Sequence, residues 1–149
     1  MPVRTAVAED TDEIGSLICE LAAYEQLGHE VDWAPDRLRE SIFGDGSPAR
    51  VLLAEVDGEI AGFALYFPTY STFLGRSGIW LEDLFVRERF RGRGLGKELL
   101  FTLRGLTDGR VEWNVLDWNE AAVAFYESLG ARPVRGWTTY RWLPGALAS

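Results

Sequence analysis

The sequence is poor in the residues that hold metal ions or form disulfide bonds. Its 149 residues include one cysteine, Cys19, and one histidine, His29. A lone cysteine cannot close an internal disulfide, and a lone histidine cannot anchor a His/Cys metal site, so we expect a metal-free protein. The first ten residues contain no long apolar run and already include Glu9, a pattern that fits no secretory signal. We therefore expect a cytoplasmic protein.

Basic residues are also scarce, and they are unevenly placed. Lys and Arg number 15 against 23 Asp and Glu, a formal net charge of −8, which disfavours a nucleic-acid backbone as the main partner. Residues 87–97 contain five basic residues and one acidic residue, a net charge of +4, so the other 138 residues carry −12. The basic island predicts a bound anion. The acidic remainder serves solubility or attracts a cationic partner.

The composition excludes a disordered tail and a membrane span. Apolar residues make up 47% of the chain and charged residues 26%, as in soluble globular proteins. A chain of 149 residues has room for one hydrophobic core. We expect a single domain over residues 1–149 and no membrane partner.

Hydrophobic periodicity and turn signals predict an α+β fold with a mixed sheet covered by helices on both faces. Pro35 suits the first turn of a helix, and Asp57-Gly58 is a strong hairpin signal. The expected strands cover 3–7, 51–56, 59–66, 78–86, 110–115 and 137–143. The expected helices cover the region from about residue 10 to 25, 35–43, 95–106 and 119–129.

The most informative segment is 84–100, where an apolar strand runs into a turn with glycines at 92, 94 and 96 and then into an amphipathic helix. Such glycines let a ligand approach the backbone, and the free N–H groups of a helix start favour an anion. Arg91 and Arg93 add charged donors for phosphate. A Walker A loop would need glycine at 91 and Ser or Thr at 98, and a dinucleotide fingerprint would need glycine at 97. The turn is a diphosphate cradle or a mobile surface loop.

This turn resembles the pyrophosphate loop of the GCN5-related N-acetyltransferase (GNAT) superfamily, Gln/Arg-x-x-Gly-x-Gly/Ala, through Arg91, Gly94 and Gly96. Other segments resemble its spermidine/spermine (diamine) N-acetyltransferase branch, in the family's order. They are 20–25, 62–67, 81–86, 118–120, 125–126 and 129–131. The resemblance implies the GNAT fold, with six or seven mostly antiparallel strands and about four helices. It also implies transfer of an acetyl group from acetyl-CoA to a primary amine of a small molecule, a polyamine, diamine or lysine analogue, by direct attack in a ternary complex.

The resemblance further implies a coenzyme site along a strand end, the turn and the last helix. The backbone of 84–86 would hold the acetyl carbonyl and the pantetheine arm where neighbouring strands splay apart. The residues expected to bind the coenzyme are Leu84, Phe85, Val86, Arg91, Gly92, Arg93, Gly94, Leu95, Gly96, Lys97, Asn119, Ala122 and Tyr126.

Two residues are candidates for proton transfer. An alkyl amine has a pKa near ~10 and must lose a proton before it attacks. Glu82 lies in an otherwise apolar strand, where a charge is costly, and the resemblance implies that it accepts this proton. Alternatively, Glu82 and Asp83 flank a β-bulge or pair with an arginine. Tyr126 shares a helical face with Asn119 and Ala122, and the resemblance implies that it protonates the departing thiolate; core packing is the alternative.

For the acceptor amine, the resemblance implies contacts from the end of the first helix and from two strands. The residues are Tyr24, Glu25, Glu82, Asp83, Glu112, Trp113 and Asn114. Carboxylates and aromatic rings suit an ammonium group, although Glu25 fits a solvated helix face equally well. Arg135 stands where the branch is expected to carry an acid. A cation there would repel a polycation by ~1 kcal/mol or more and favours an amine that also bears a carboxylate.

Two other functions remain open at this stage. A non-catalytic sensor of acyl-CoA would keep the turn without the chemistry, and a protein Lys or N-terminal acetyltransferase would use the same chemistry on a larger acceptor. Cys19 is an acetyl carrier or, more simply, an inert thiol. The resemblance implies a homodimer, in whose interface Trp137 and Trp142 could lie.

Overall fold

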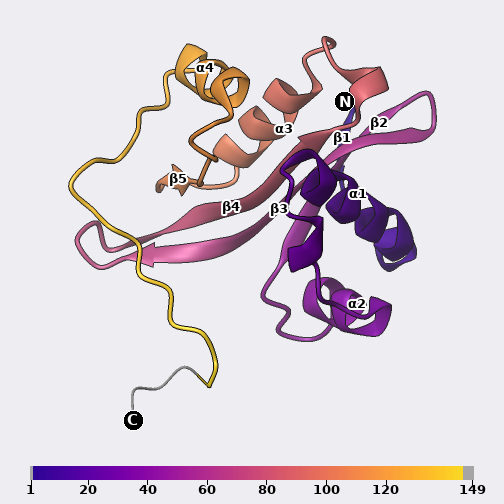
Figure 1. Cartoon of the computed structure of the whole chain (residues 1–149), viewed down its shortest axis with the longest axis horizontal. Helices are drawn as coiled ribbons and strands as arrows, with labels where there is room; N and C mark the ends of the chain where they lie inside the picture. The colour runs from indigo at the N-terminus through magenta and orange to yellow at the C-terminus, as the bar shows by residue number, and fades with distance from the viewer. Residues whose placement is uncertain (1, 146–149) are drawn as a thin grey trace. The chain divides into compact units, whose positions relative to one another are not determined.

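A computed structural model describes residues 2–145, which fall into two compact units, Met1–Asn114 and Val115–Ser149. The first unit contains the sheet and three helices, and the second contains one helix (Figure 1). The strands are β1 (Val3–Thr5), β2 (Arg50–Val56), β3 (Glu59–Ser71), β4 (Arg76–Val86) and β5 (Val111–Glu112). The helices are α1 (Thr11–Tyr24), α2 (Pro35–Phe43), α3 (Leu95–Arg104) and α4 (Glu120–Ser128).

The five strands form one mixed sheet in the order β1-β2-β3-β4-β5. The first three pairings are antiparallel, and β5 runs parallel to β4. Asp57 and Gly58 join β2 to β3 with φ angles of 51° and 80°. Two consecutive positive φ angles are what a tight type I′ hairpin requires, so the hairpin predicted from Asp57-Gly58 is confirmed.

The main core lies between one face of the sheet and helices α1 and α2. Pro35 begins α2, as predicted, because its missing N–H costs nothing at the first helical position. Gly15 of α1 allows close packing, since a Cβ there would lie 2.8 Å from the Trp33 ring. The buried members of this core are Ala6, Ile14, Leu17, Leu21, Leu38, Ile42, Val51, Leu53, Phe63, Leu65 and Phe85.

Helix α3 covers the opposite face of the sheet. Side chains alternate between faces along a strand, so Leu52 and Ala64, neighbours of core residues in sequence, point away from α1 and are buried. Helix α3 packs against the strands β1 to β4 through its buried residues Leu95, Leu99, Leu100 and Leu103. The predicted mixed sheet with helices on both faces is therefore confirmed within the first unit.

Two strand predictions are wrong. The expected strand at 110–115 contains only Val111 and Glu112, and residues 137–143, expected to be the last strand, form no strand. The sheet accordingly has five strands rather than six or seven. A strand is stable only when a neighbour pairs with its backbone, and residues 115–145 contain a helix and no strand. The aromatic residues at 137–142 favour a strand locally but supply no partner.

Candidate active site

A β-bulge lies at Glu82, where β4 carries one residue more than β3. Leu65 pairs with Asp83 but Tyr66 pairs with Leu81, so Glu82 is the extra residue. Beyond the bulge, Asp83 shares a sheet face with Phe85, the face that α1 covers, whereas Glu82 is exposed. Bulges re-aim side chains in this way. The bulge considered above is confirmed, and the catalytic role of Glu82 stays a prediction.

Three carboxyl groups, Glu25, Glu82 and Asp83, form an acidic group where α1 ends beside β4. Burial raises the pKa of Glu25 above its usual range. The pKa of Asp83 is raised to about 7, mainly by burial and further by repulsion from Glu82 and Glu25. Low polarity and like charges both disfavour the ionised form. Asp83 therefore changes its protonation state close to neutral pH.

The raised pKa of Asp83 was not predicted from the sequence, which gave this residue only as a contact to the acceptor amine. A signal was present in the alternation of β4. Asp83 stands two residues before Phe85, so a regular strand places both on the same buried face. A carboxyl group on a buried face is expected to have a perturbed pKa.

Strand β4 extends well beyond its partner β5. The two strands pair over two residues only, and after Glu112 the chain leaves the strand conformation. Gly78 permits the close approach at the start of this pairing, since a Cβ there would lie 2.6 Å from the carbonyl oxygen of Arg110. Within residues 2–114, the last part of β4, up to Val86, therefore has no strand on this side.

The hydrogen-bond alternation shows which groups face that open edge. Arg87 N donates to Ala61 O at 2.8 Å, so these two residues form a hydrogen-bonded pair. In an antiparallel ladder such pairs alternate with pairs whose N–H and C=O groups point outwards. Phe85 is then bonded to β3, while Leu84 and Val86 direct their backbone groups to the open edge. This open edge is where the acetyl carbonyl and the pantetheine arm are expected, and their binding there stays a prediction.

The glycine-rich turn follows β4 and leads into α3. Gly92 and Gly94 have φ angles of 81° and 77°, which suit glycine and strain other residues. The first helical hydrogen bond runs from Glu98 N to Gly94 O at 3.0 Å, so the N–H groups of residues 95–97 have no acceptor within the helix. A Cβ at either glycine would meet no atom within 4 Å. The turn thus presents open backbone donors, as an anion site requires.

The basic island divides into two sets. Arg87 pairs with Glu13 at 2.6 Å and Glu20 at 2.9 Å, both on α1, and Arg89 pairs with Glu59 at 3.4 Å. These two arginines therefore form ion pairs with α1 and with β3. The other three cations, Arg91, Arg93 and Lys97, are exposed around the turn and fit a diphosphate.

The side chain of Arg91 contacts both the end of β4 and the end of α1. Its Nε donates to the carbonyl oxygen of Val86 at 2.9 Å. Its guanidinium carbon lies 5.1 Å from the ring centre of Tyr24 and 5.5 Å from that of Phe85. Arg93 differs, because its guanidinium lies 5.5 Å from the ring centre of Phe90.

In the second unit, Asn119 caps α4. Its Oδ1 accepts a hydrogen bond from Ala122 N at 3.2 Å, a usual N-cap arrangement. Ala122 and Tyr126 are both half-buried, whereas Ala121 and Glu127 are exposed. The shared helical face predicted for Asn119, Ala122 and Tyr126 agrees with this pattern, and their chemical roles stay predictions.

The remaining residues expected to contact the acceptor amine lie in several parts of the chain. Glu112 belongs to β5, but Trp113 and Asn114, expected in the same strand, follow it in an extended segment. Tyr24 is the last residue of α1, and 42% of its surface is exposed. Arg135 is exposed.

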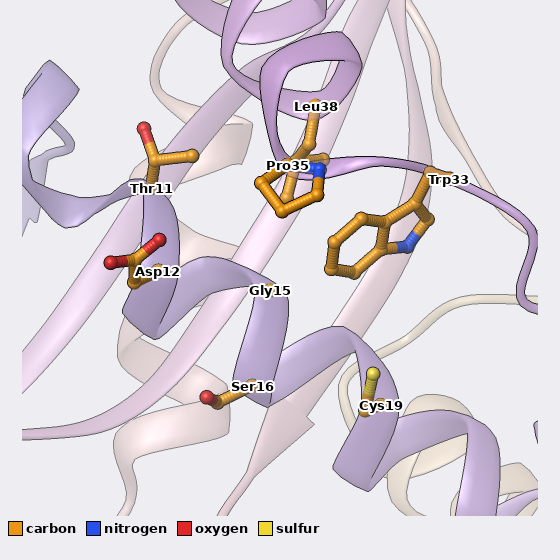
Figure 2. A pocket seen from close by; sticks show the side chains of 8 residues that line it. All are labelled: Thr11, Asp12, Gly15, Ser16, Cys19, Trp33, Pro35 and Leu38. Atoms are coloured by element: carbon orange, nitrogen blue, oxygen red, sulfur yellow. The ribbon is translucent and has the colours of Figure 1, made fainter.

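A separate cavity of about 330 Å³ lies between α1 and the segment leading into α2 (Figure 2). It is lined by Thr11, Asp12, Gly15, Ser16, Cys19, Trp33, Pro35 and Leu38. Among these eight residues, Cys19 is the one considered above for a chemical role. The cavity is largely apolar, and Cys19 at its border carries an exposed thiol.

Over residues 2–145, no three or more His, Cys, Asp and Glu side chains are grouped so that they could hold a metal ion. In the same range, no helix has the length and apolar character needed to cross a bilayer.

Comparison with known proteins gives several long matches. Thialysine N-epsilon-acetyltransferase of Mus musculus is 34% identical over 156 aligned residues, covering 93% of this chain and 90% of that protein. L-ornithine N5-acetyltransferase NATA1 of Arabidopsis thaliana is 44% identical over 95 residues, which cover 61% of this chain and 42% of that protein. An integron cassette protein of V. cholerae has the same fold, with a TM-score of 0.80, 25% identity and coverage of 98% and 95% of the two chains.

The profile of the Acetyltransferase (GNAT) family matches residues 17–131. The match spans the acidic group, the open edge of β4, the glycine-rich turn and α4. Together with relatives named as N-acetyltransferases, it confirms the resemblance seen in the motifs, and this chain, an N-acetyltransferase, belongs to the GNAT family.

Proposed function

We propose that the protein transfers the acetyl group of acetyl-CoA to a primary amine of a small molecule by direct attack in a ternary complex. The observation that carries this proposal is the open edge at Leu84 and Val86. Along the chain, this edge lies between the bulge that carries Glu82 and the glycine-rich turn, called the cationic turn below because of Arg91, Arg93 and Lys97. One end of the edge suits an ammonium group and the other suits a diphosphate.

The coenzyme would bind along the second half of this edge. Backbone groups of Leu84 and Val86 would bind the acetyl carbonyl and the pantetheine arm, and Phe85 packs beneath them. The N–H groups of residues 95–97 and the side chains of Arg91, Arg93 and Lys97 would hold the diphosphate, with Gly92 and Gly94 keeping the backbone accessible. Bound acetyl-CoA supplies the activated thioester.

Two proton transfers balance the reaction. The N–C bond to the acetyl group forms as the C–S bond breaks, so the amine loses a proton and the thiolate gains one. Glu82, exposed at the bulge, would receive the proton together with Asp83, whose pKa of about 7 suits a base at neutral pH. Tyr126 would protonate the thiolate, and Asn119 and Ala122 would contact the coenzyme.

For the acceptor we propose an amine of the diamine or lysine-analogue type. Relatives are named for thialysine and ornithine, and a spermidine/spermine acetyltransferase-like protein of Homo sapiens is 34% identical over 154 residues. Tyr24, the acidic group and Glu112 would surround an ammonium group, with Trp113 and Asn114 completing the site. Arg135 would pair with a carboxylate, which favours thialysine or lysine over spermine.

An acetyl-transfer assay tests the proposal directly. Thiol release from acetyl-CoA would be measured with thialysine, lysine, putrescine, spermidine and spermine, with a peptide bearing a free amine as the comparison. We expect the highest kcat/KM with thialysine or lysine. Tight coenzyme binding without turnover on any acceptor would indicate a sensor, and a preference for the peptide would indicate a protein acetyltransferase.

We also propose that both units belong to one acetyltransferase domain, since the family match at residues 17–131 crosses the boundary after Asn114. A cytoplasmic homodimer is the proposed state. Trp137 and Trp142 are largely exposed in the single chain and suit a subunit interface. Size-exclusion chromatography with light scattering would test the dimer, and a monomeric mass at micromolar concentration would contradict it.

A further inference from the structure

The side chain of Arg91 contacts one group proposed to bind the coenzyme and another proposed to bind the amine. Its Nε donates to Val86 O at 2.9 Å, a carbonyl at the open edge where the pantetheine arm would bind. Its guanidinium lies 5.1 Å from the ring centre of Tyr24, an aromatic residue beside the acidic group. The guanidinium therefore lies over a ring on the proposed amine side of the site.

An arginine over Tyr24 opposes the binding of an ammonium group. Cations bind aromatic faces within about 6 Å, so the guanidinium already takes the position that an amine substrate would use. Two like charges at one ring also repel each other, most strongly where water is partly excluded. The amine therefore binds the free protein more weakly than the carboxylates alone would allow.

A diphosphate would reverse this arrangement. Arginine makes bidentate, charge-assisted hydrogen bonds to phosphate, which are stronger than its contacts with a half-exposed ring and one carbonyl. Movement of Arg91 to the diphosphate would release Val86 O for the pantetheine arm and the Tyr24 ring for the ammonium group.

We propose that Arg91 is a positioning residue that couples the two substrates, so that coenzyme binding moves it from Tyr24 and prepares the amine site. This inference rests on the proposed function and adds to it a coupling between the two substrate sites. Coupling between sites is reciprocal, so a bound amine also strengthens coenzyme binding by the same factor.

Isothermal titration calorimetry on the full chain tests the coupling, with coenzyme A and thialysine as a non-reacting pair. In the wild type, saturating coenzyme A should tighten thialysine binding about fivefold, the size expected for one screened charge contact. In Arg91→Ala, thialysine should bind the free protein as tightly as it binds the loaded wild type, and coenzyme A should add no further gain. Coupling that persists in Arg91→Ala overturns the proposal.

Arg93→Ala is the matched control. It removes one positive charge from the same turn, but Arg93 lies over Phe90 rather than Tyr24. It should weaken coenzyme binding and leave the coupling factor intact. Equal loss of coupling in both variants would show a general charge effect and overturn the specific role of Arg91. Thermal unfolding of each variant confirms that it is folded, and Arg91→Gln replaces Arg91→Ala if the latter is not.

A second measurement needs no amine. Tyr24→Leu removes a ring that competes with the diphosphate for Arg91, so coenzyme A should bind this variant about two- to fivefold more tightly, the equivalent of one exposed cation–π contact. A purely structural role of the Arg91–Tyr24 contact would leave the affinity unchanged or lower it. Tyr24→Phe keeps the ring and should bind coenzyme A with the affinity of the wild type.

The outcomes separate this inference from the proposed function. Failure of coenzyme A to bind the wild type contradicts the proposed function itself. Coenzyme binding that is unchanged or weaker in Tyr24→Leu overturns the coupling alone, whatever the acceptor.

Discussion

The acidic group lies at the bulge in β4, and the cationic turn follows the end of the same strand. The two regions are built in different ways. The turn is continuous in sequence, and its charged side chains are exposed. The acidic group joins the end of α1 to a bulge in β4, and its central member, Asp83, is largely buried. An exposed local site offers fixed charges, whereas a buried non-local site can tune protonation. The difference suits a region that holds a permanently charged diphosphate and a region that must accept a proton.

The most severe test of this contrast is removal of the buried carboxylate. Asp83→Asn should lower kcat/KM about 100-fold or more, the usual contribution of a general base. In the wild type, kcat/KM should rise with pH through about 7 because Asp83 must be deprotonated to accept a proton. The variant should lose this ionisation in a pH–rate profile. Glu82→Gln should lower activity while keeping an ionisation, and an unchanged profile in Asp83→Asn would remove Asp83 from proton transfer.

The predicted acid of the reaction is Tyr126 in α4. Tyr126→Phe removes one hydroxyl group and should lower kcat about 100-fold. Coenzyme A affinity should change little, because the ring is retained. Calorimetry and steady-state kinetics on the same preparation separate the two effects. Phe125, the neighbouring aromatic residue in α4, gives a control as Phe125→Leu, and an unchanged kcat in Tyr126→Phe would exclude Tyr126 as the acid.

Stability should also depend on the buried carboxyl group. The pKa of Asp83 is higher in the folded state, about 7, than the ordinary 3.8 expected after unfolding. The folded protein therefore binds more protons between these values, and the free energy of unfolding falls as pH rises from about 4 to 7. Asp83→Asn should stabilise the protein at pH 8 by about 4 kcal/mol at most, the equivalent of this difference in pKa.

Urea unfolding at pH 5 and pH 8 measures this effect. Asp45→Asn makes the same charge change at an exposed loop position after α2 and should leave the pH dependence as in the wild type. An equal gain from Asp83→Asn at both pH values would contradict the assigned ionisation.

The smallest expected effect concerns the backbone of the cationic turn. Gly94→Ala places a side chain at a φ angle of 77°, which costs about 1 kcal/mol, so coenzyme A should bind about fivefold more weakly. Gly105→Ala is the matched control at the other end of α3, since Gly105 has a φ angle of −76°. Equal affinities in the two variants would show that the left-handed conformation of Gly94 does not shape the coenzyme site.

Much of the fold could be predicted because its signals are local. Pro35 begins a helix, Asp57-Gly58 forms a hairpin and Gly94 precedes α3, and in each case one residue's own backbone preference decides the outcome. The strand expected at 137–143 shows the limit of such signals. Its aromatic residues favour an extended backbone, but pairing depends on a neighbour that sequence periodicity does not identify.

The sequence by itself determined the family, the cationic turn and the candidate residues of the site, because motifs and charges can be read along one strand–turn–helix segment. Only the tertiary structure decided what those residues do to one another. It paired Arg87 with carboxylates of α1, raised the pKa of Asp83 through burial and neighbouring carboxylates, and placed Arg91 over Tyr24. Burial and through-space distance set these properties, and both arise only when segments far apart in the chain are packed together.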